Sequence, residues 1–375
     1  MRHLLIAGCL LCFALPFGVG GCTAPRPGVP PGPAAPPPSV RPAAGRVLPQ
    51  DVRDTVEERL ARGRYVGLAV AVLDSSGRAV YGFGRTAKDS TGVPVTGETR
   101  FEIGSVTKTL TGLLLADAVE RGEATLETTL GALLPDSLPP SVAGITLRQL
   151  TTHTSGLPRL PPNLAGPGFS LLDPYAAYDD ARLRAYLATA RPDTAAQRLG
   201  TVAYSNLGAG LLGHLLARRA GMPYADLLAA RVTARLPGVA LTTDVPARGM
   251  ATGHTAQGRP TPPWTFTDAL VGAGGVRASA SSMLAYLDAQ LHPSGPLAPA
   301  LRRSHTVLAR DGERRNVAYG WFTADRPDGT RVFWHNGGTG GFAAFVAFVP
   351  DTGRAVVVLS NVAGGVDDLG AMLLR

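Results

Sequence analysis

The stretch Phe101–Lys108, FEIGSVTK, runs directly into the apolar segment Thr107–Arg121, whose leucines predict a buried helix. This spacing places Ser105 at the first turn of that helix. Residues three apart share a face of a helix, so the Lys108 ammonium can reach the Ser105 hydroxyl. The positive field at a helix N-terminus favours a developing alkoxide or oxyanion. The pair therefore predicts a serine nucleophile with an adjacent lysine base.

Lysine is rare in this chain, and its rarity supports that interpretation. Only two of the 36 basic residues are lysines, Lys88 and Lys108, and the others are arginines. To act as a base, Lys108 must lose its proton, so its pKa must fall from the usual value of about 10.4. Arginine does not deprotonate in proteins. A lysine at this position, in a chain that otherwise uses arginine, indicates proton transfer.

A polar triplet, Tyr204-Ser205-Asn206, stands immediately before the apolar helix predicted over Leu207–Arg219. Tyr204 is placed to share the proton transfer, and Asn206 to hold Lys108 and a substrate amide. An N-cap formed by Ser205 or Asn206 is a second reading of the same triplet, and it does not exclude the first. The triplet therefore predicts a second wall of the site.

A glycine-rich segment, WHNGGTGG (Trp334–Gly341), lies between two predicted strands near the C-terminus. Backbone without side chains lets a substrate approach closely enough to hydrogen-bond main-chain groups. We expect the amides of Ser105 and Gly338 to form an oxyanion hole.

The predicted elements indicate an α+β fold: an antiparallel sheet formed from both chain ends and flanked by helices, with a helical region inserted between them. A helix and a hairpin are expected near the start of the domain, strands and a short closing helix near its end, and mostly helices between. The ranges are Asp51–Ala61, Tyr65–Leu73 and Ala79–Phe83 at the start; Ala181–Ala190, Leu207–Arg219, Tyr224–Arg231 and Ser281–Leu291 in the middle; and Arg331–Trp334, Phe342–Val349 and Ala355–Leu359 at the end.

The N-terminal 50 residues read as targeting and tether segments. Residues 1–22 read as a signal peptide, and Val19-Gly20-Gly21-Cys22 resembles the bacterial lipobox, in which the cysteine is acylated. Residues 23–50 hold 10 of the 32 prolines and form a tether. We expect secretion across the cytoplasmic membrane to a periplasmic or cell-surface location, with a lipid on Cys22; a plain signal peptide is the alternative. Residues 51–375 form the hydrolase domain.

Several function classes are disfavoured by composition. The net charge is +8, but the arginines are scattered in ones and twos, so we expect no nucleic-acid partner. The three cysteines all lie in the first 22 residues, and the histidines show no metal-ligand spacing, so we expect neither a metal site nor a cofactor. No serine has glycine two before and two after it, which excludes the usual α/β-hydrolase motif.

Over residues 55–375 the chain resembles the group of serine hydrolases that contains class C β-lactamases, D-alanyl-D-alanine carboxypeptidases and esterases. The resemblance implies a β-lactamase/transpeptidase-like fold, acylation of Ser105, proton handling by Lys108 and Tyr204, and substrate-carboxylate binding by the third motif. It implies a structural role for His153. The segments that carry it, in the family's order, are Phe101–Lys108, ITLRQLTTHTSGL (Ile145–Leu157), Tyr204-Ser205-Asn206, GAGGVRAS (Gly272–Ser279) and HNGGTGG (His335–Gly341), the last including Gly337, Gly338 and Thr339.

The third motif departs from the class C pattern. Class C β-lactamases usually have Lys-Thr-Gly where this chain has His335-Asn336-Gly337. Histidine is mostly neutral near pH 7, so it predicts a weaker, pH-dependent grip on a carboxylate. The expected substrate is a small molecule or a peptidoglycan peptide. Hydrolysis of D-Ala-D-Ala-type peptides or β-lactams, hydrolysis of small esters, and a penicillin-binding sensor without turnover all stay open.

Overall fold

The computed structural model describes residues 47–134, 138–192, 201–313 and 315–375. All described residues belong to one compact unit of the chain. The predicted signal peptide, Cys22 and most of the proline-rich tether lie outside the described residues, so the N-terminal assignment stays a prediction.

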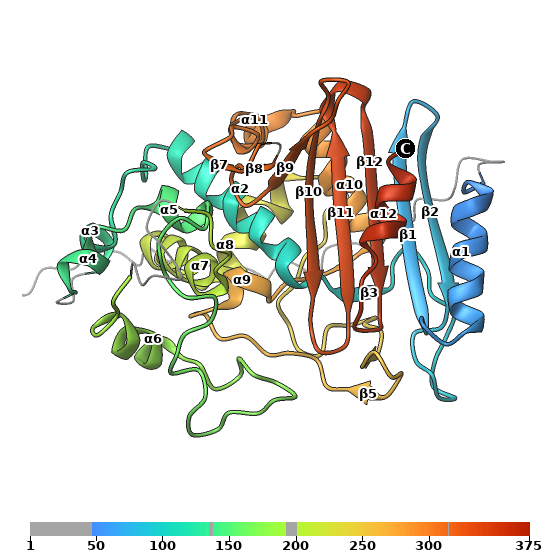
Figure 1. The fold of residues 1–375 in the computed structure, drawn as a ribbon, viewed down its shortest axis with the longest axis horizontal. Helices are drawn as coiled ribbons and strands as arrows, with labels where there is room; N and C mark the ends of the chain where they lie inside the picture. The colour runs from blue at the N-terminus through green and yellow to red at the C-terminus, as the bar shows by residue number, and fades with distance from the viewer. Residues whose placement is uncertain (1–46, 135–137, 193–200, 314) are drawn as a thin grey trace, which may run out of the picture. The chain divides into compact units, whose positions relative to one another are not determined.

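An eight-stranded antiparallel sheet dominates the fold, with strand order β2-β1-β12-β11-β10-β9-β8-β7 (Figure 1). Strand β1 from the N-terminal half pairs with β12 from the C-terminal end, which confirms the predicted sheet built from both chain ends. The strands are β1 (Gly67–Asp74), β2 (Gly77–Gly84), β7 (Ala309–Asp311), β8 (Arg315–Val317), β9 (Phe322–Asp325), β10 (Arg331–Gly338), β11 (Ala343–Val349) and β12 (Arg354–Ser360).

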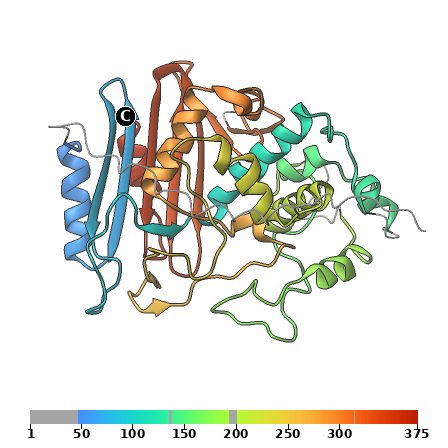
Figure 2. The same cartoon turned by 180° about the vertical axis from the view of Figure 1, so that it is seen from behind.

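The central strands are buried on both faces because their alternating side chains meet a different layer of helices on each side. In β1, Leu68 and Val70 pack with Val52 and Val56 of α1 (Gln50–Ala61) and with α12 (Asp367–Leu373). The intervening Ala69 belongs to the larger core, which includes α10 (Ala280–Leu291). Figures 1 and 2 show α1 and α12 on one face of the sheet and α10 on the other.

The helical region lies between the two halves of the sheet in sequence, as predicted, and it also contains two short sheets, β3-β6 and β4-β5. The predicted helices agree with the structure to within a few residues at their ends. The elements of this region are β3 (Arg100–Glu102), α2 (Thr107–Glu120), α3 (Leu130–Leu133), α4 (Pro140–Ala143), α5 (Leu147–Thr151), α6 (Asp180–Leu187), α7 (Asn206–Ala220), α8 (Tyr224–Arg231), β4 (Gly253–His254), β5 (Pro260–Thr261), α9 (Val271–Gly274), β6 (Arg277–Ser279) and α11 (Ala298–Ser304), with 3-10 turns η1 (Gly104–Val106), η2 (Thr233–Arg235) and η3 (Gly295–Leu297). A further 3-10 turn, η4 (Pro350–Thr352), lies between β11 and β12.

The structure corrects the sequence prediction in two places that affect the site. Strand β10 was expected to end at Trp334, but it continues to Gly338, because Gly337 and Gly338 pair with β11. Ser105 was expected in the first turn of the α-helix, but it lies in the 3-10 turn η1 that leads into α2. The glycine-rich motif thus belongs to the sheet as far as Gly338, and only its last residues, 339–341, lie between β10 and β11.

The described parts of the chain contain no helix that is both long enough and apolar enough to cross a bilayer.

Candidate active site

Ser105 sits where the turn η1 touches the end of strand β10. Gly104 has φ +48°, and a side chain there would come within 2.7 Å of the Gly338 nitrogen. A side chain on Gly337 would come within 2.0 Å of the Ile103 carbonyl and 3.0 Å of the Ser105 nitrogen. Both positions require glycine, and their glycines bring the backbone of β10 against the nucleophile's own amide. This proximity is what an oxyanion hole built from the amides of Ser105 and Gly338 requires.

Lys108 reaches Ser105 from the next turn and is almost completely buried, at 2% exposed. Its Nζ lies 3.0 Å from Ser105 Oγ, 2.9 Å from Asn206 Oδ1 and 2.6 Å from the Ala273 carbonyl oxygen. A neutral amine keeps two N–H groups and one lone pair. The amide and carbonyl oxygens can take the two hydrogens, which leaves the lone pair for the Ser105 hydroxyl.

The surroundings of Lys108 favour that neutral form. Burial, and to a smaller extent the positive charge of Arg159, hold the pKa of Lys108 well below its usual 10.5. No acidic residue is among the three partners of its amine. The amine is therefore arranged to act as a base.

The pKa of Tyr204 is shifted in the opposite direction from that of Lys108. Burial raises the pKa of Tyr204 to about 12, against a smaller opposing effect of its hydrogen bond with Ser105. Its ring also lies 4.9 Å from Lys108 Nζ. Since the phenol keeps its proton near neutral pH, Lys108 is the better proton acceptor, and Tyr204 suits proton delivery to a leaving group.

The start of α7 positions both Tyr204 and Asn206. Ser205 is the N-cap: its Oγ accepts from Gly208 N at 2.9 Å and donates to the Pro158 carbonyl at 2.7 Å. This cap fixes the first turn, so that the Asn206 amide oxygen meets Lys108. The structure therefore contains both the N-cap and the contact between Asn206 and Lys108, while proton transfer by Tyr204 stays a prediction.

His153 has a structural role, as the family resemblance implies. It is 3% exposed, and its Nδ1 accepts a hydrogen bond from Ser205 N at 3.3 Å. Its carbonyl oxygen accepts from Ala203 N at 2.8 Å. His153 therefore ties the segment that follows α5 to the residues that precede α7.

His335 lies in a different environment from the one predicted. The expectation was a pH-dependent grip on a substrate carboxylate, but the ring is 1% exposed and is absent from the pocket lining, where Asn336 and Gly337 appear instead. Its Nδ1 lies 2.6 Å from the Asn336 carbonyl oxygen. Burial, with the charge of Lys108 as a smaller cause, lowers the pKa of His335 to about 3. A direct carboxylate contact would require the ring to be uncovered.

We expect the His335 ring to stay neutral from pH 8 to pH 5, because its pKa lies below that range. NMR of the imidazole protons, with the signal assigned by its loss in His335→Asn, measures this directly. A titration midpoint near 6.5 would contradict the buried location and restore the pH-dependent grip.

The pocket in front of Ser105 has a volume of about 550 Å³. Two of its lining side chains are charged, Arg159 and Asp367, and the sequence prediction included neither. Ser105, Gly338 and Thr339 also line a smaller adjoining cavity. The lining of the larger pocket is Ser105, Arg159, Leu160, Tyr175, Tyr204, Asn206, Trp264, Phe322, Asn336, Gly337, Gly338, Ala343, Ala344, Gly364, Val366 and Asp367.

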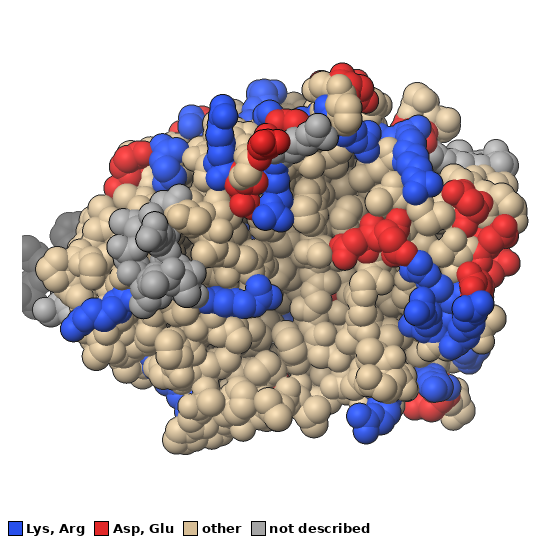
Figure 3. All heavy atoms as spheres, in the orientation of Figure 1, with Lys and Arg blue, Asp and Glu red and all other residues tan. Residues whose placement is uncertain are grey.

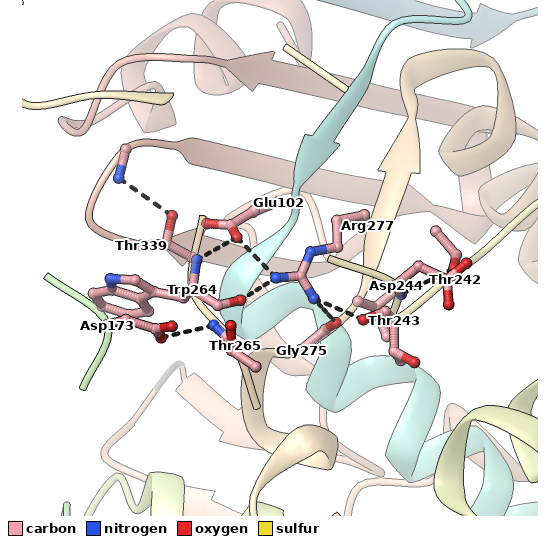
Figure 4. A network of polar contacts seen from close by, with 12 residues as sticks. Glu102, Asp173, Thr242, Thr243, Asp244, Trp264, Thr265, Gly275, Arg277 and Thr339 are labelled. Carbon is pink, nitrogen blue, oxygen red and sulfur yellow. Dashed lines mark hydrogen bonds and ion pairs between the residues drawn. The ribbon is translucent and has the colours of Figure 1, made fainter. Parts of the chain in front are cut away.

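A buried ion pair supports one wall of this pocket (Figure 4). Arg277 donates to Glu102 Oε1 at 2.9 Å, and the two side chains are 1% and 2% exposed. Arg277 also donates to the Trp264 carbonyl oxygen, and Trp264 N donates to the same Glu102 oxygen at 2.8 Å. The pair thus holds the backbone of Trp264, whose side chain lines the pocket. Both charged residues stand in motifs quoted above, but their pairing was not predicted.

Replacing Arg277 by methionine should lower the free energy of unfolding by roughly 3–5 kcal/mol, because it leaves Glu102 buried without its partner. Urea unfolding measures this. The double variant with Glu102→Gln should recover part of the loss. Arg148→Met, which breaks the exposed pair with Glu127, should cost about 1 kcal/mol or less. If the Arg277 and Arg148 variants lowered the free energy of unfolding equally, the buried pair would stabilise the fold no more than the exposed one.

Among the described residues, no group of three or more His, Cys, Asp and Glu side chains could hold a metal ion. On the face drawn in Figure 3, Lys and Arg occur in small groups with Asp and Glu between them. The expectations of no cofactor and no nucleic-acid partner stay predictions.

The model of the beta-lactamase family matches residues 52–374. A beta-lactamase of Pseudomonas fluorescens is 30% identical over 352 residues, covering 83% of this chain and 93% of that protein. The D-alanyl-D-alanine-carboxypeptidase/endopeptidase AmpH of Escherichia coli K12 is 28% identical over 330 residues, covering 81% of this chain and 83% of that protein. The crystal structure of D-alanine carboxypeptidase AmpC from Burkholderia cenocepacia superposes with a TM-score of 0.73 at 29% identity, covering 87% of this chain and 98% of that one.

These matches span the whole predicted hydrolase domain, and they confirm the β-lactamase/transpeptidase-like fold. The relatives that the chain resembles are named for both β-lactam and D-alanyl-D-alanine hydrolysis. The chain belongs to the beta-lactamase family and is a serine hydrolase.

Proposed function

We propose that this chain is an extracytoplasmic hydrolase that forms an acyl-enzyme on Ser105 and acts on D-Ala-D-Ala-type peptides, β-lactams or both. The observation that carries the proposal is the placement of Lys108 Nζ, 3.0 Å from Ser105 Oγ and with two acceptors for its remaining hydrogens. The extracytoplasmic part rests on the signal and lipobox pattern of residues 1–22.

The chemical sequence follows from the positions of these groups. Lys108 removes the proton from Ser105, whose oxygen attacks the substrate carbonyl. The amides of Ser105 and Gly338 hold the oxyanion, and Tyr204 delivers a proton to the departing nitrogen or oxygen. The Lys108 ammonium then passes the proton it took from Ser105 to Tyr204, which restores both groups. Water attacks the acyl group and gives up one proton, the bond to Ser105 Oγ breaks and that oxygen takes up a proton, so that the acid product and the free Ser105 hydroxyl are released. Asn206 keeps Lys108 in place throughout.

A second candidate, an esterase for small esters, is favoured by the state of His335. With a neutral, buried ring, the motif His335–Gly341 has no cation for the carboxylate that β-lactams and D-Ala-D-Ala peptides carry. Ester hydrolysis needs the same nucleophile, base and oxyanion hole but no such cation. A penicillin-binding sensor, acylated without turnover, would also use Ser105.

Incubation of the full chain with a chromogenic cephalosporin, a D-Ala-D-Ala peptide and a short-chain 4-nitrophenyl ester separates these functions. Turnover of the first two supports the main proposal, and turnover of the ester alone supports the esterase. A stable adduct without turnover indicates the sensor. No turnover and no adduct on Ser105 would overturn the acyl-serine mechanism.

A further inference from the structure

Arg159 occupies a fixed position on the wall of the pocket. Its carbonyl oxygen accepts hydrogen bonds from Asn206 N at 2.9 Å and from Leu207 N at 3.3 Å. The preceding carbonyl, that of Pro158, accepts from the Ser205 hydroxyl at 2.7 Å. The backbone at Arg159 is therefore held against the first turn of α7, next to the residue that contacts Lys108.

The side chain of Arg159 is exposed and directed into the pocket that contains Ser105. Its guanidinium carbon lies 5.0 Å from the centre of the Tyr204 ring. Within the described residues, its guanidinium has no carboxylate partner and donates no side-chain hydrogen bond, unlike the buried Arg277. Stacking on an aromatic ring leaves the in-plane N–H donors of a guanidinium available, and their fork matches a carboxylate.

The other charged side chain of the pocket does not serve as that carboxylate. Asp367 begins α12 and makes no ion pair with Arg159. It is hydrogen-bonded to Asn336 and to its own backbone. Lys108 is buried behind Ser105 with all its acceptors supplied by the chain. Among the described residues of the lining, Arg159 is therefore the cation that the pocket offers to a ligand.

We propose that Arg159 binds a carboxylate that the substrate carries outside its scissile bond, and so makes the enzyme prefer anionic substrates. This inference rests on the proposed acyl-serine function and names the substrate class of the same site. It places the carboxylate subsite beside α7 rather than at His335, and it makes Arg159 a specificity-determining residue.

Arg159 also has an effect that does not involve a substrate anion, since its charge contributes to the lowered pKa of Lys108. Loss of that charge would slow the reaction with every substrate. A neutral substrate that lacks the carboxylate but has the same scissile bond therefore separates the two roles.

The test compares mono-4-nitrophenyl adipate with 4-nitrophenyl hexanoate, which have the same chain length and leaving group and differ by one carboxylate. The full chain and its Arg159→Gln and Arg159→Lys variants are measured with both esters. We expect Arg159→Gln to lower kcat/KM for the adipate ester about 10- to 100-fold, mainly through KM, as loss of one charge-assisted pair predicts. The hexanoate ester should change by about 3-fold or less, and Arg159→Lys should lie between. High salt should reduce the wild-type preference for the adipate.

An equal loss with both esters would overturn the inference, since Arg159 would then act through Lys108 or through the structure. An unchanged adipate rate would overturn it as well. Both of these outcomes leave the acyl-serine function intact, because the hexanoate ester is still hydrolysed. If the wild type hydrolyses neither ester, nor any substrate of the panel above, and carries no adduct on Ser105, the proposed function fails and the inference fails with it.

Discussion

Lys108→Arg is expected to lower kcat/KM roughly 10³-fold on any substrate that the enzyme turns over, although the substitution preserves the positive charge. The reason is the proton: the lysine amine is buried, and its pKa is held well below 10.5, whereas a guanidinium keeps its proton. A structural cation at this position would tolerate the exchange much better.

The other lysine of the chain supplies the matched control. Lys88 is exposed and lies outside the pocket, so Lys88→Arg should leave both kcat and KM unchanged. Thermal unfolding of Lys108→Arg checks that the larger side chain has not disrupted the fold. If the folded Lys108→Arg variant stays within about 10-fold of the wild type, Lys108 is not the base and the proton must go elsewhere.

Ser105→Ala is expected to have the largest effect, a loss of roughly 10⁴-fold or more in kcat, because no acyl-enzyme can form without the hydroxyl. The side chain is small and half-buried in the turn before α2, so the fold should be preserved. Substrate binding should survive, since the oxyanion amides and Arg159 remain in place.

Ser90→Ala, at an exposed position outside the pocket, is the matched control and should behave as the wild type. Rate measurements with the best substrate of the panel decide the question. Turnover by Ser105→Ala within about 100-fold of the wild type would mean that another group carries the chemistry.

The fold could be predicted because its main signals are local and strong. The strands β1, β11 and β12 are continuous apolar runs, and the leucines of α2 and α7 have helical spacing. Strands β7 to β9 were not predicted, since they are three or four residues long and carry polar side chains that are no different from those of a loop. Their place in the sheet is set by pairing, since β9 pairs with β10, β8 with β9 and β7 with β8.

The contact between Ser105 and Lys108 could be predicted because its geometry is set within one turn of chain. The environment of His335 could not, because neighbouring residues of a strand point to opposite faces. Phe333 belongs to the larger core on one face of the sheet, and Trp334 packs against the smaller core on the opposite face. His335 therefore points to the same face as Phe333. The motif HNGGTGG itself does not indicate which face of the strand is covered by other elements.

Arg159 and the Glu102–Arg277 pair illustrate a second limit. Each of these residues lies in or beside one of the family motifs, but its role depends on a partner that is far away in the sequence. The partner of Arg159 is Tyr204, and Glu102 and Arg277 are separated by 175 residues. A single sequence contains no signal for such pairings. Because almost all basic residues of this chain are arginines, the presence of an arginine at a given position does not indicate a special role.

Every function proposed for this chain requires that Ser105 becomes acylated with the help of Lys108. Mass spectrometry of the full chain, quenched in acid shortly after mixing with a penicillin or a 4-nitrophenyl ester, detects such an acyl-enzyme. We expect an acyl adduct on the peptide that contains Ser105, slower to appear in Lys108→Arg and absent in Ser105→Ala. An adduct on another residue, or turnover by the wild type with Ser105 never modified, would contradict it.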